Sequence, residues 1–205
     1  MPAKNEDLHG NVPDTSPVAL ILIDVINDFE FPGGDRLLEH AMPMARRLRE
    51  LKQRVKAAGI PVVYVNDNFG KWQSDQGKLL AHALEDDVRG RPFVEQLVPD
   101  EDDYFVLKPK HSGFYSTTLD TLLAYLKVRT VILTGLAGNN CVLFTASDAF
   151  LRDLHIVVPS DCVASIDQED NAYALRQMRQ VLHADTTPST ELDLERLCRG
   201  APPGE

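Results

Sequence analysis

The sequence predicts an α/β fold of three layers, α/β/α, in which helices cover both faces of a doubly wound sheet of six parallel strands. Two observations carry this prediction. Short apolar runs alternate along the chain with segments of helical periodicity, and the first run, VALILI, is apolar at every position. Continuous apolar strands are typical of a parallel sheet that is buried on both faces. Strands that alternate with helices indicate a Rossmann-like topology.

The expected elements follow in chain order. The first strand covers residues 18–23 and ends at Asp24. Apolar residues then recur at helical spacing over 37–58, and Gly59 marks the end of that helix. A long connection separates the second expected strand from the third, and connections of that length are usually functional. The remaining strands are expected at 61–65, 104–107, 130–134, 155–158 and 184–187, and the remaining helices at 117–126, 141–151 and 168–182.

The composition favours one globular domain. The chain has 205 residues, 43% of them apolar and 25% charged, which suits one sizeable core. Residues 1–16 are polar and lack periodicity, so they predict a flexible N-terminal arm. We expect the domain to span 17–190 and a polar C-terminal tail to occupy 191–205.

Charge and cysteine content exclude several classes of protein. A net charge of −10 without a long basic cluster argues against a nucleic-acid partner. No apolar run approaches the length of a membrane span, and the N-terminus lacks a signal-peptide pattern. The three cysteines fit neither a disulfide framework nor a zinc site. Similarly, the acidic stretches 85–87 and 100–103 indicate solvated loops. We expect a cytoplasmic protein.

Polar residues at strand ends locate the expected site, because ligands of such sheets bind beyond the carboxyl ends of the strands. Asp24 follows the first strand, and Lys108 ends the third. Each has a simpler explanation: Asp24 could cap a turn, and Lys108 could extend to solvent. Lys110 competes with Lys108, and the strand pattern does not decide between them.

Cys141 gives the strongest single signal. The loop GLAGNN delivers it to the first turn of a predicted helix, where backbone N–H groups and the helix dipole favour a thiolate. The same N–H groups could stabilise an oxyanion. The alternative is a small buried apolar residue, which is how we interpret Cys162 and Cys198.

Three ordered segments resemble the isochorismatase-like cysteine hydrolases. They are LILIDVINDF, VLKPKHSGFYSTTL and TGLAGNNCVLFTASDA, and the resemblance extends over residues 18–187. It implies the isochorismatase-like hydrolase fold. In that family the catalytic lysine precedes an aromatic residue by six positions, which selects Lys108, with Phe114, over Lys110.

The resemblance implies a mechanism and an assembly. Asp24 would be the general base for Cys141, and Lys108 would orient the pair and lower the pKa of the thiol. A cis peptide would join Ala137 to Gly138, and the N–H groups of Gly138 and Cys141 would form the oxyanion hole. The implied reaction is hydrolysis of an amide or ureido C–N bond of a small molecule through an acyl-enzyme, without a cofactor. Homodimers or homotetramers are usual in the family.

The sequence departs from the family pattern in ways that bear on the substrate. Gly138 stands where threonine is common, and Ile26 where glutamine is common. Nicotinamidases carry an Asp-x-His metal motif after the second strand, whereas this chain reads YVNDNFGKW there. We therefore expect no catalytic metal and disfavour a nicotinamidase.

Aromatic and amide side chains near the expected crevice are candidates for substrate binding. Phe29 matches a pocket aromatic of the family. Asn68 and Trp72 lie in the stretch after the second strand, which could equally form a subunit contact. Tyr115 is a further candidate. Finally, His111 lies in the Lys108 loop and could contact a substrate.

Four alternative functions are compatible with parts of this pattern. Isochorismatase-type hydrolysis of a vinyl ether does not use a cysteine nucleophile, so the presence of Cys141 argues against it. A catalytically silent protein that binds a small ligand would leave Cys141 no more reactive than a free thiol. A redox-sensing cysteine would need a resolving cysteine nearby. Dinucleotide binding is rejected, because GLAGNN lacks the G-x-G-x-x-G spacing.

Overall fold

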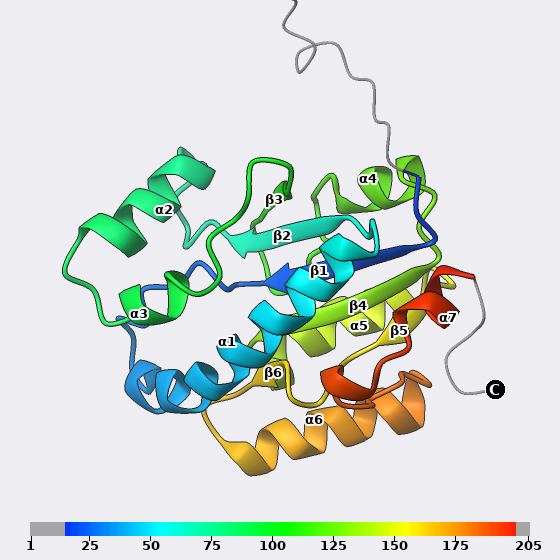
Figure 1. Ribbon diagram of the computed structural model, residues 1–205. Helices are drawn as coiled ribbons and strands as arrows, with labels where there is room; N and C mark the ends of the chain where they lie inside the picture. The colour runs from blue at the N-terminus through cyan, green and yellow to red at the C-terminus, as the bar shows by residue number, and fades with distance from the viewer. Residues whose placement is uncertain (1–14, 200–205) are drawn as a thin grey trace, which may run out of the picture.

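The computed structural model describes residues 15–199, which form a single parallel sheet between two layers of helices (Figure 1). The predicted fold class is confirmed: the sheet has six strands in the order β3-β2-β1-β4-β5, with β6 paired to β4, and every pairing is parallel. The strands are β1 (Val18–Ile23), β2 (Val62–Asp67), β3 (Tyr104–Lys108), β4 (Thr130–Leu136), β5 (His155–Val157) and β6 (Val163–Ala164).

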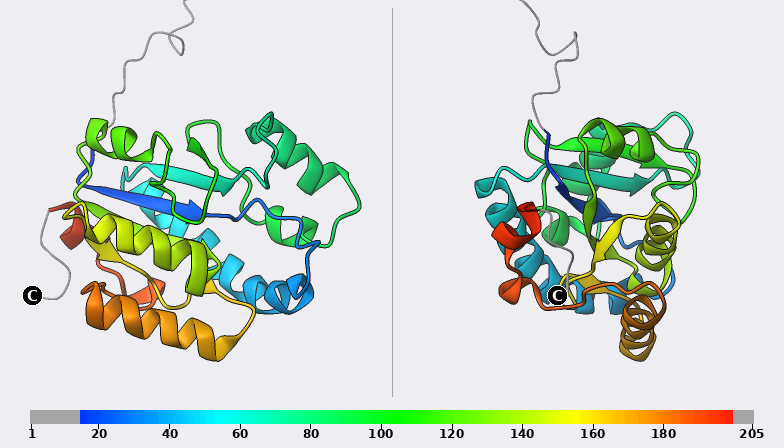
Figure 2. Two further views of the ribbon diagram at one scale, coloured as in Figure 1. Left: turned by 180° about the vertical axis from the view of Figure 1, so that it is seen from behind. Right: turned by 90° about the vertical axis from the view of Figure 1, so that its right-hand side faces the viewer.

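Helices lie on both faces of the sheet, and the second view in Figure 2 separates the two layers. One layer contains α1 and α7, and the other contains α4, α5 and α6. The helices are α1 (Gly34–Ala57), α2 (Gln76–Glu85), α3 (Arg91–Val94), α4 (Leu119–Tyr125), α5 (Leu143–Phe150), α6 (Gln168–Val181) and α7 (Leu194–Cys198); a π-helical turn, Gly138–Val142, precedes α5, and a 3-10 turn, Ser189–Glu191, precedes α7.

Strand β1 is buried on both faces of the sheet, which accounts for its continuous apolar sequence. Leu20 and Leu22 pack in the core under α1, whereas Ile21 and Ile23 pack in the core under α4 and α5. All six residues of β1 are fully buried, because alternate side chains of a strand point to opposite faces of the sheet. Each buried leucine or isoleucine contributes about 1.5–3 kcal/mol to folding. The strand is therefore anchored in both halves of the core.

A close approach between β1 and β4 sets the geometry at the carboxyl edge of the sheet. Gly135, near the end of β4, adopts a φ of 106°, and a Cβ atom there would lie 2.1 Å from the backbone oxygen of Ile23. Any side chain would force the two strand ends apart. Glycine at this position lets the residues that follow β1 and β4 meet.

The sixth strand lies elsewhere than the sequence indicated. Residues 184–187 form only an isolated bridge, between Val157 and Asp185, and the sixth strand is the two-residue β6, which pairs with the end of β4. Two residues are too few to leave a periodic pattern. The long connection between β2 and β3 contains α2 and α3, neither of which was predicted.

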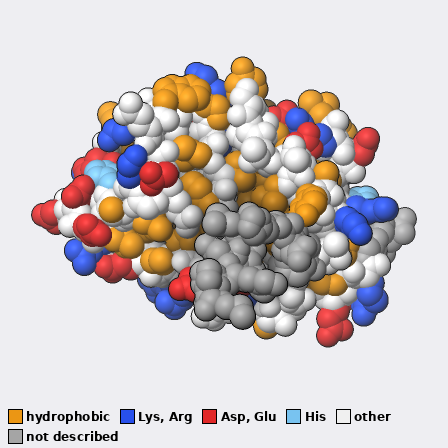
Figure 3. All heavy atoms as spheres, turned by 90° about the horizontal axis from the view of Figure 1, so that it is seen from above, with side chains coloured by type: hydrophobic (Ala, Val, Ile, Leu, Met, Phe, Trp, Pro, Cys, Tyr) orange, Lys and Arg blue, Asp and Glu red, His pale blue; other side chains and the backbone are white. Residues whose placement is uncertain are grey.

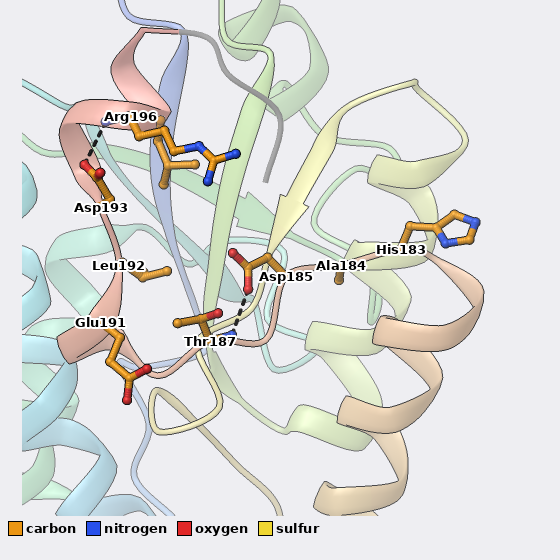
Figure 4. Close-up of a pocket in the computed structure, with 9 residues that line it drawn as sticks. His183, Ala184, Asp185, Thr187, Glu191, Leu192, Asp193 and Arg196 are labelled. Atoms are coloured by element: carbon orange, nitrogen blue, oxygen red, sulfur yellow. Dashed lines mark hydrogen bonds between the residues drawn. The ribbon is translucent and has the colours of Figure 1, made fainter. Parts of the chain in front are cut away.

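The expected polar tail is also partly wrong, because residues 191–199 belong to the packed domain. Leu192, Leu194 and Leu197 are buried, and Arg54 of α1 donates hydrogen bonds to the carbonyls of Ser189 and Leu192. In Figure 4 the Asp193 carboxylate caps α7 by accepting a hydrogen bond from the backbone of Arg196. The expected arm lies mostly outside the described residues, as does the end of the tail. None of the described helices has the length and apolar character needed to cross a membrane.

The acidic stretch 100–103 is not simply a solvated loop. The Asp103 side chain is 2% exposed and lies 2.6 Å from the ammonium of Lys52, itself 8% exposed. Lys52 also contacts Asp100 and donates to the hydroxyl of Tyr64. Lys56 contacts the same acidic group at its rim, so lysine ammonium groups already occupy the position that a cation would take.

We expect Lys52→Ala to lower the free energy of unfolding by about 3 kcal/mol, because it leaves the buried Asp103 carboxylate with a weaker partner. Urea denaturation measures this change. Arg47→Ala is the matched control in the same helix: its partner is the exposed Glu50, so the loss should be at most about 0.5 kcal/mol. Equal losses in the two variants would contradict a structural role for the buried pair.

Candidate active site

The carboxyl edge of the sheet brings Asp24, Lys108 and Cys141 together. Asp24 follows β1 with a φ of 52°, Lys108 is the last residue of β3, and Cys141 lies in the π-helical turn after β4. A left-handed backbone at a residue other than glycine costs about 1–2 kcal/mol and is often found at functional sites. Lys108 is fully buried, and Asp24 and Cys141 are 6% and 8% exposed. These three positions were chosen from the sequence.

Lys108 lies between the other two side chains. Its Nζ is 2.9 Å from Oδ2 of Asp24 and 3.5 Å from Sγ of Cys141, and the carboxyl of Asp24 and the thiol of Cys141 also share a hydrogen bond. Lys108 therefore does not extend to solvent. The competing Lys110 is exposed and contributes only its backbone carbonyl, 3.2 Å from Lys108 Nζ. The geometry favours Lys108.

Asp67 is a second carboxylate at this centre, and sequence reasoning missed it. Its Oδ2 lies 3.3 Å from Lys108 Nζ, and its backbone N–H donates to Oδ1 of Asp24 over 2.7 Å. Asp67 is the last residue of β2. The rule that singled out Asp24 and Lys108, a polar residue at a strand end, could therefore have found it.

Burial dominates the protonation of the centre. It raises the pKa of Asp24 above the usual range, against the opposing effect of the Lys108 charge. Burial and the neighbouring Asp24 charge raise the pKa of Cys141 to about 12, although Lys108 acts to lower it. Lys108 thus acts on the thiol in the expected direction, but burial and Asp24 outweigh it and the net shift of the Cys141 pKa is upward. Burial lowers the pKa of Lys108, but the charges of Asp24 and Cys141 outweigh it, so the net shift is upward and the ammonium persists.

The centre opens into a cleft of about 760 Å³. Asp24, Asp67 and Cys141 form its floor, and Arg36 from the first turn of α1 lies on its wall. The Arg36 guanidinium is 3.6 Å from Asp167, so it is already paired. A small molecule can reach the thiol through this cleft. Further lining residues are Asn27, Phe31, Phe69, Ala137, Asn140 and Ile166.

The expected pocket aromatic, Phe29, does not line the cleft. It is fully buried and packs edge-to-face on Phe93, with ring centroids 5.1 Å apart. Phe31 lines the cleft in its place and stacks on Phe29. The backbone at Phe29 is left-handed, with a φ of 58°. A sequence alignment alone does not show which of two nearby phenylalanines faces a cavity.

The other three candidates for substrate binding lie outside this cleft. Asn68 is buried, and Trp72 is 79% exposed; both line a neighbouring hollow of about 580 Å³. Phe69 belongs to the walls of both cavities. Tyr115 is 58% exposed and does not line either cavity. The hollow extends the cleft toward α2. His82 of this helix contacts Asp28, with Nε2 2.9 Å from Oδ2.

The cis peptide joins Leu136 to Ala137, one residue before the expected Ala137–Gly138 bond. Gly138 already belongs to the π-helical turn and faces away from the cleft: a Cβ atom there would lie 2.2 Å from Oδ1 of Asn171. Ala137 lines the cleft, as Cys141 does. The expected correspondence with the family is therefore displaced by one residue.

Comparisons with known proteins agree with this fold. The isochorismatase domain model matches residues 18–190. The uncharacterized isochorismatase family protein YaaI of Bacillus subtilis is 41% identical over 174 residues, which cover 85% of this chain and 95% of that protein. The ureidoacrylate amidohydrolase RutB of Methylobacterium radiotolerans is 29% identical, over 78% of this chain and 71% of that protein.

A solved structure extends the likeness to three dimensions. The crystal structure of N-carbamoylsarcosine amidase from Thermoplasma acidophilum matches with a TM-score of 0.66 and 28% identity, over 86% of this chain and 98% of that one. The family model, the sequence relatives and the sheet topology indicate the same family. The chain therefore belongs to the isochorismatase family, whose members are hydrolases and include amidohydrolases.

Proposed function

We propose that the protein hydrolyses an amide or ureido C–N bond of a small molecule through an acyl-enzyme on Cys141. The observation that carries this proposal is the contact of the Cys141 thiol with both Asp24 and the Lys108 ammonium at the floor of an open cleft. A nucleophile beside a base, with the base held by a third group, is the arrangement that covalent catalysis requires. The names of RutB and of the Thermoplasma amidase describe hydrolysis of this bond class.

The first step couples transfer of the Cys141 proton to Asp24 with attack of the sulfur on the substrate carbonyl. Because the pKa of Cys141 is raised to about 12, this transfer accompanies attack on the substrate rather than preceding it. The sulfur forms a bond to the carbonyl carbon, and the backbone N–H groups of Ala137 and Cys141 donate hydrogen bonds to the oxyanion in this proposal. Ala137 replaces Gly138 in this role, because Ala137 is the residue that lines the cleft.

The second half of the cycle returns every group to its starting state. The C–N bond breaks as Asp24 gives its proton to the departing nitrogen. Asp24 then takes a proton from water, which attacks the thioester, and the acid leaves as the thiol is protonated again. Lys108 remains an ammonium throughout and holds Asp24 in place. These steps use groups of the chain, water and substrate, so the proposal includes no cofactor.

The proposal extends to assembly. We expect a homodimer or homotetramer, as in the family that the sequence resembles. On the face seen from above in Figure 3, apolar side chains are exposed between charged side chains of both signs. Such a face suits contact with another copy of the chain better than contact with nucleic acid.

The first test is ammonia release from a panel of small primary amides, ureides and carbamoyl compounds. We expect the wild-type protein to act on at least one of them and Cys141→Ala to be inactive, because the acyl acceptor is lost. Cys198→Ala is the matched control, since Cys198 lies in α7 and outside the cleft lining. Release that survives in Cys141→Ala would refute the acyl-enzyme.

Asp24→Asn separates the role of the base from that of the nucleophile. We expect turnover to fall by about 10²–10⁴-fold, because the amide cannot accept the thiol proton. Alkylation of Cys141 by iodoacetamide should become faster, since the carboxylate charge that raises the pKa of the thiol is gone. Peptide-level mass spectrometry measures the labelling. Substantial turnover in Asp24→Asn would contradict the assignment of Asp24 as base.

Lys108→Gln should move the acid limb of the kcat/KM profile to higher pH. The Lys108 charge lowers the pKa of Asp24, so without it the carboxyl keeps its proton at higher pH and the basic form becomes scarcer at neutrality. A pH series from mildly acidic to alkaline buffers measures the shift. Lys110→Gln, an exposed change in the same loop, should leave the profile in place. An unshifted limb in Lys108→Gln would exclude this electrostatic role.

A further inference from the structure

His111 presents another polar group to the sulfur of Cys141. The residue lies in the loop between β3 and α4, and its Nδ1 is 3.9 Å from Sγ. The mechanism proposed above does not use it. His111 is exposed, whereas Lys108 and Asp24 are buried, so the imidazole lies on the solvent side of the thiol.

The chain that directly follows His111 is held by α5, the helix that follows Cys141. The Ser112 hydroxyl hydrogen-bonds the carboxylate of Asp148, and the N–H of Gly113 donates to Oγ1 of Thr145 over 3.0 Å. The Thr145 hydroxyl in turn donates to the carbonyl of Cys141 over 2.7 Å. The loop and the nucleophile therefore share one hydrogen-bonded support.

An aromatic contact completes the placement of the ring. Phe144, in the first turn of α5, lies 5.4 Å from the imidazole, measured between ring centroids. A flat apolar neighbour restricts rotation of the imidazole about its side-chain bonds. The approach of Nδ1 to Sγ is thus supported by the contacts of Ser112 and Gly113 with α5 and by the Phe144 ring beside the imidazole.

The electrostatics at the sulfur explain what a further donor would do there. Two influences oppose ionisation of the thiol, burial and the Asp24 charge, and Lys108 favours it. A thiolate formed during attack needs hydrogen-bond donors, and Lys108 supplies one of them from the buried side. The imidazole of His111 lies beside the same sulfur.

We propose that His111 is a further catalytic residue, whose Nδ1–H donates a hydrogen bond to the Cys141 thiolate as it forms. The inference rests on the proposed function, in which Cys141 is the nucleophile. The proton of the thiol goes to Asp24, and His111 keeps its own proton throughout. Both the Nδ1–H tautomer and the imidazolium supply the required donor.

Two substitutions at this exposed position separate hydrogen bonding from packing. His111→Asn places an amide N–H close to the position of Nδ1, whereas His111→Leu keeps apolar bulk and has no donor. The rate of iodoacetamide alkylation of Cys141, followed by peptide mass spectrometry at several pH values, reports thiolate formation in the absence of substrate. Lys110→Gln serves as the control within the loop.

In His111→Leu we expect iodoacetamide to alkylate Cys141 about tenfold more slowly than in wild type, at every pH below the pKa of the thiol. This factor corresponds to the loss of one charge-assisted hydrogen bond. His111→Asn should recover most of that rate, and Lys110→Gln should match wild type. His111→Leu keeps similar bulk beside the sulfur, so access of the reagent changes little and a slower rate reports the lost donor. An equal or faster rate in His111→Leu, or a rate in His111→Asn as slow as in His111→Leu, would overturn the proposal.

The assay also keeps this inference distinct from the proposed function. Alkylation needs no substrate, so a slower rate in His111→Leu with recovery in His111→Asn would stand even if the amide panel gave no product. Where a substrate is found, His111→Leu should lower kcat and leave KM nearly unchanged, because the hydrogen bond forms only with the developing thiolate.

Discussion

The buried ammonium of Lys108 is the constraint on which the rest of the site depends. A lysine with no exposed surface must be compensated, since the cost of taking a charge out of water is several kcal/mol. Asp24, Asp67 and the carbonyl of Lys110 surround Nζ at 2.9–3.3 Å. Removal of any one partner leaves the charge less compensated, so the positions of these groups are interdependent. Cys141 lies within the same set of contacts.

The register of the parallel sheet makes this arrangement possible. Ile23 pairs with Val65 on one side and with Gly135 on the other, and Asp67 pairs with Lys108. The carboxyl ends of four neighbouring strands, β3, β2, β1 and β4, therefore finish at one edge. Lys108 starts two strands away from β1, and its long side chain spans β2 to reach Asp24. A shorter side chain from β3 could not make the same ion pair.

Much of the fold and of the site could be predicted because they follow from chain-local rules. Continuous apolar runs identified the main strands, polar residues at strand ends identified Asp24 and the candidate Lys108, and the start of a predicted helix identified Cys141. The resemblance to the family was needed to select Lys108 over Lys110. Other features depend on three-dimensional context. Phe31 rather than Phe29 lines the cleft, and the packing of α7 depends on Arg54 from a distant helix. The two-residue β6 can be recognised as a strand only by its pairing with β4.

The raised pKa of Cys141 changes what the cysteine contributes. A thiolate formed in the resting state would react with any electrophile that enters the cleft. A protonated thiol beside a carboxylate reacts only when a substrate carbonyl is placed so that proton transfer and attack occur together. In the mechanism that we propose, burial therefore lowers the intrinsic reactivity of the thiol and favours substrates that fit the cleft. The hydrogen-bonded support shared by the His111 loop and Cys141 works in the same direction, since donors held in place before the reaction stabilise charge only where it develops.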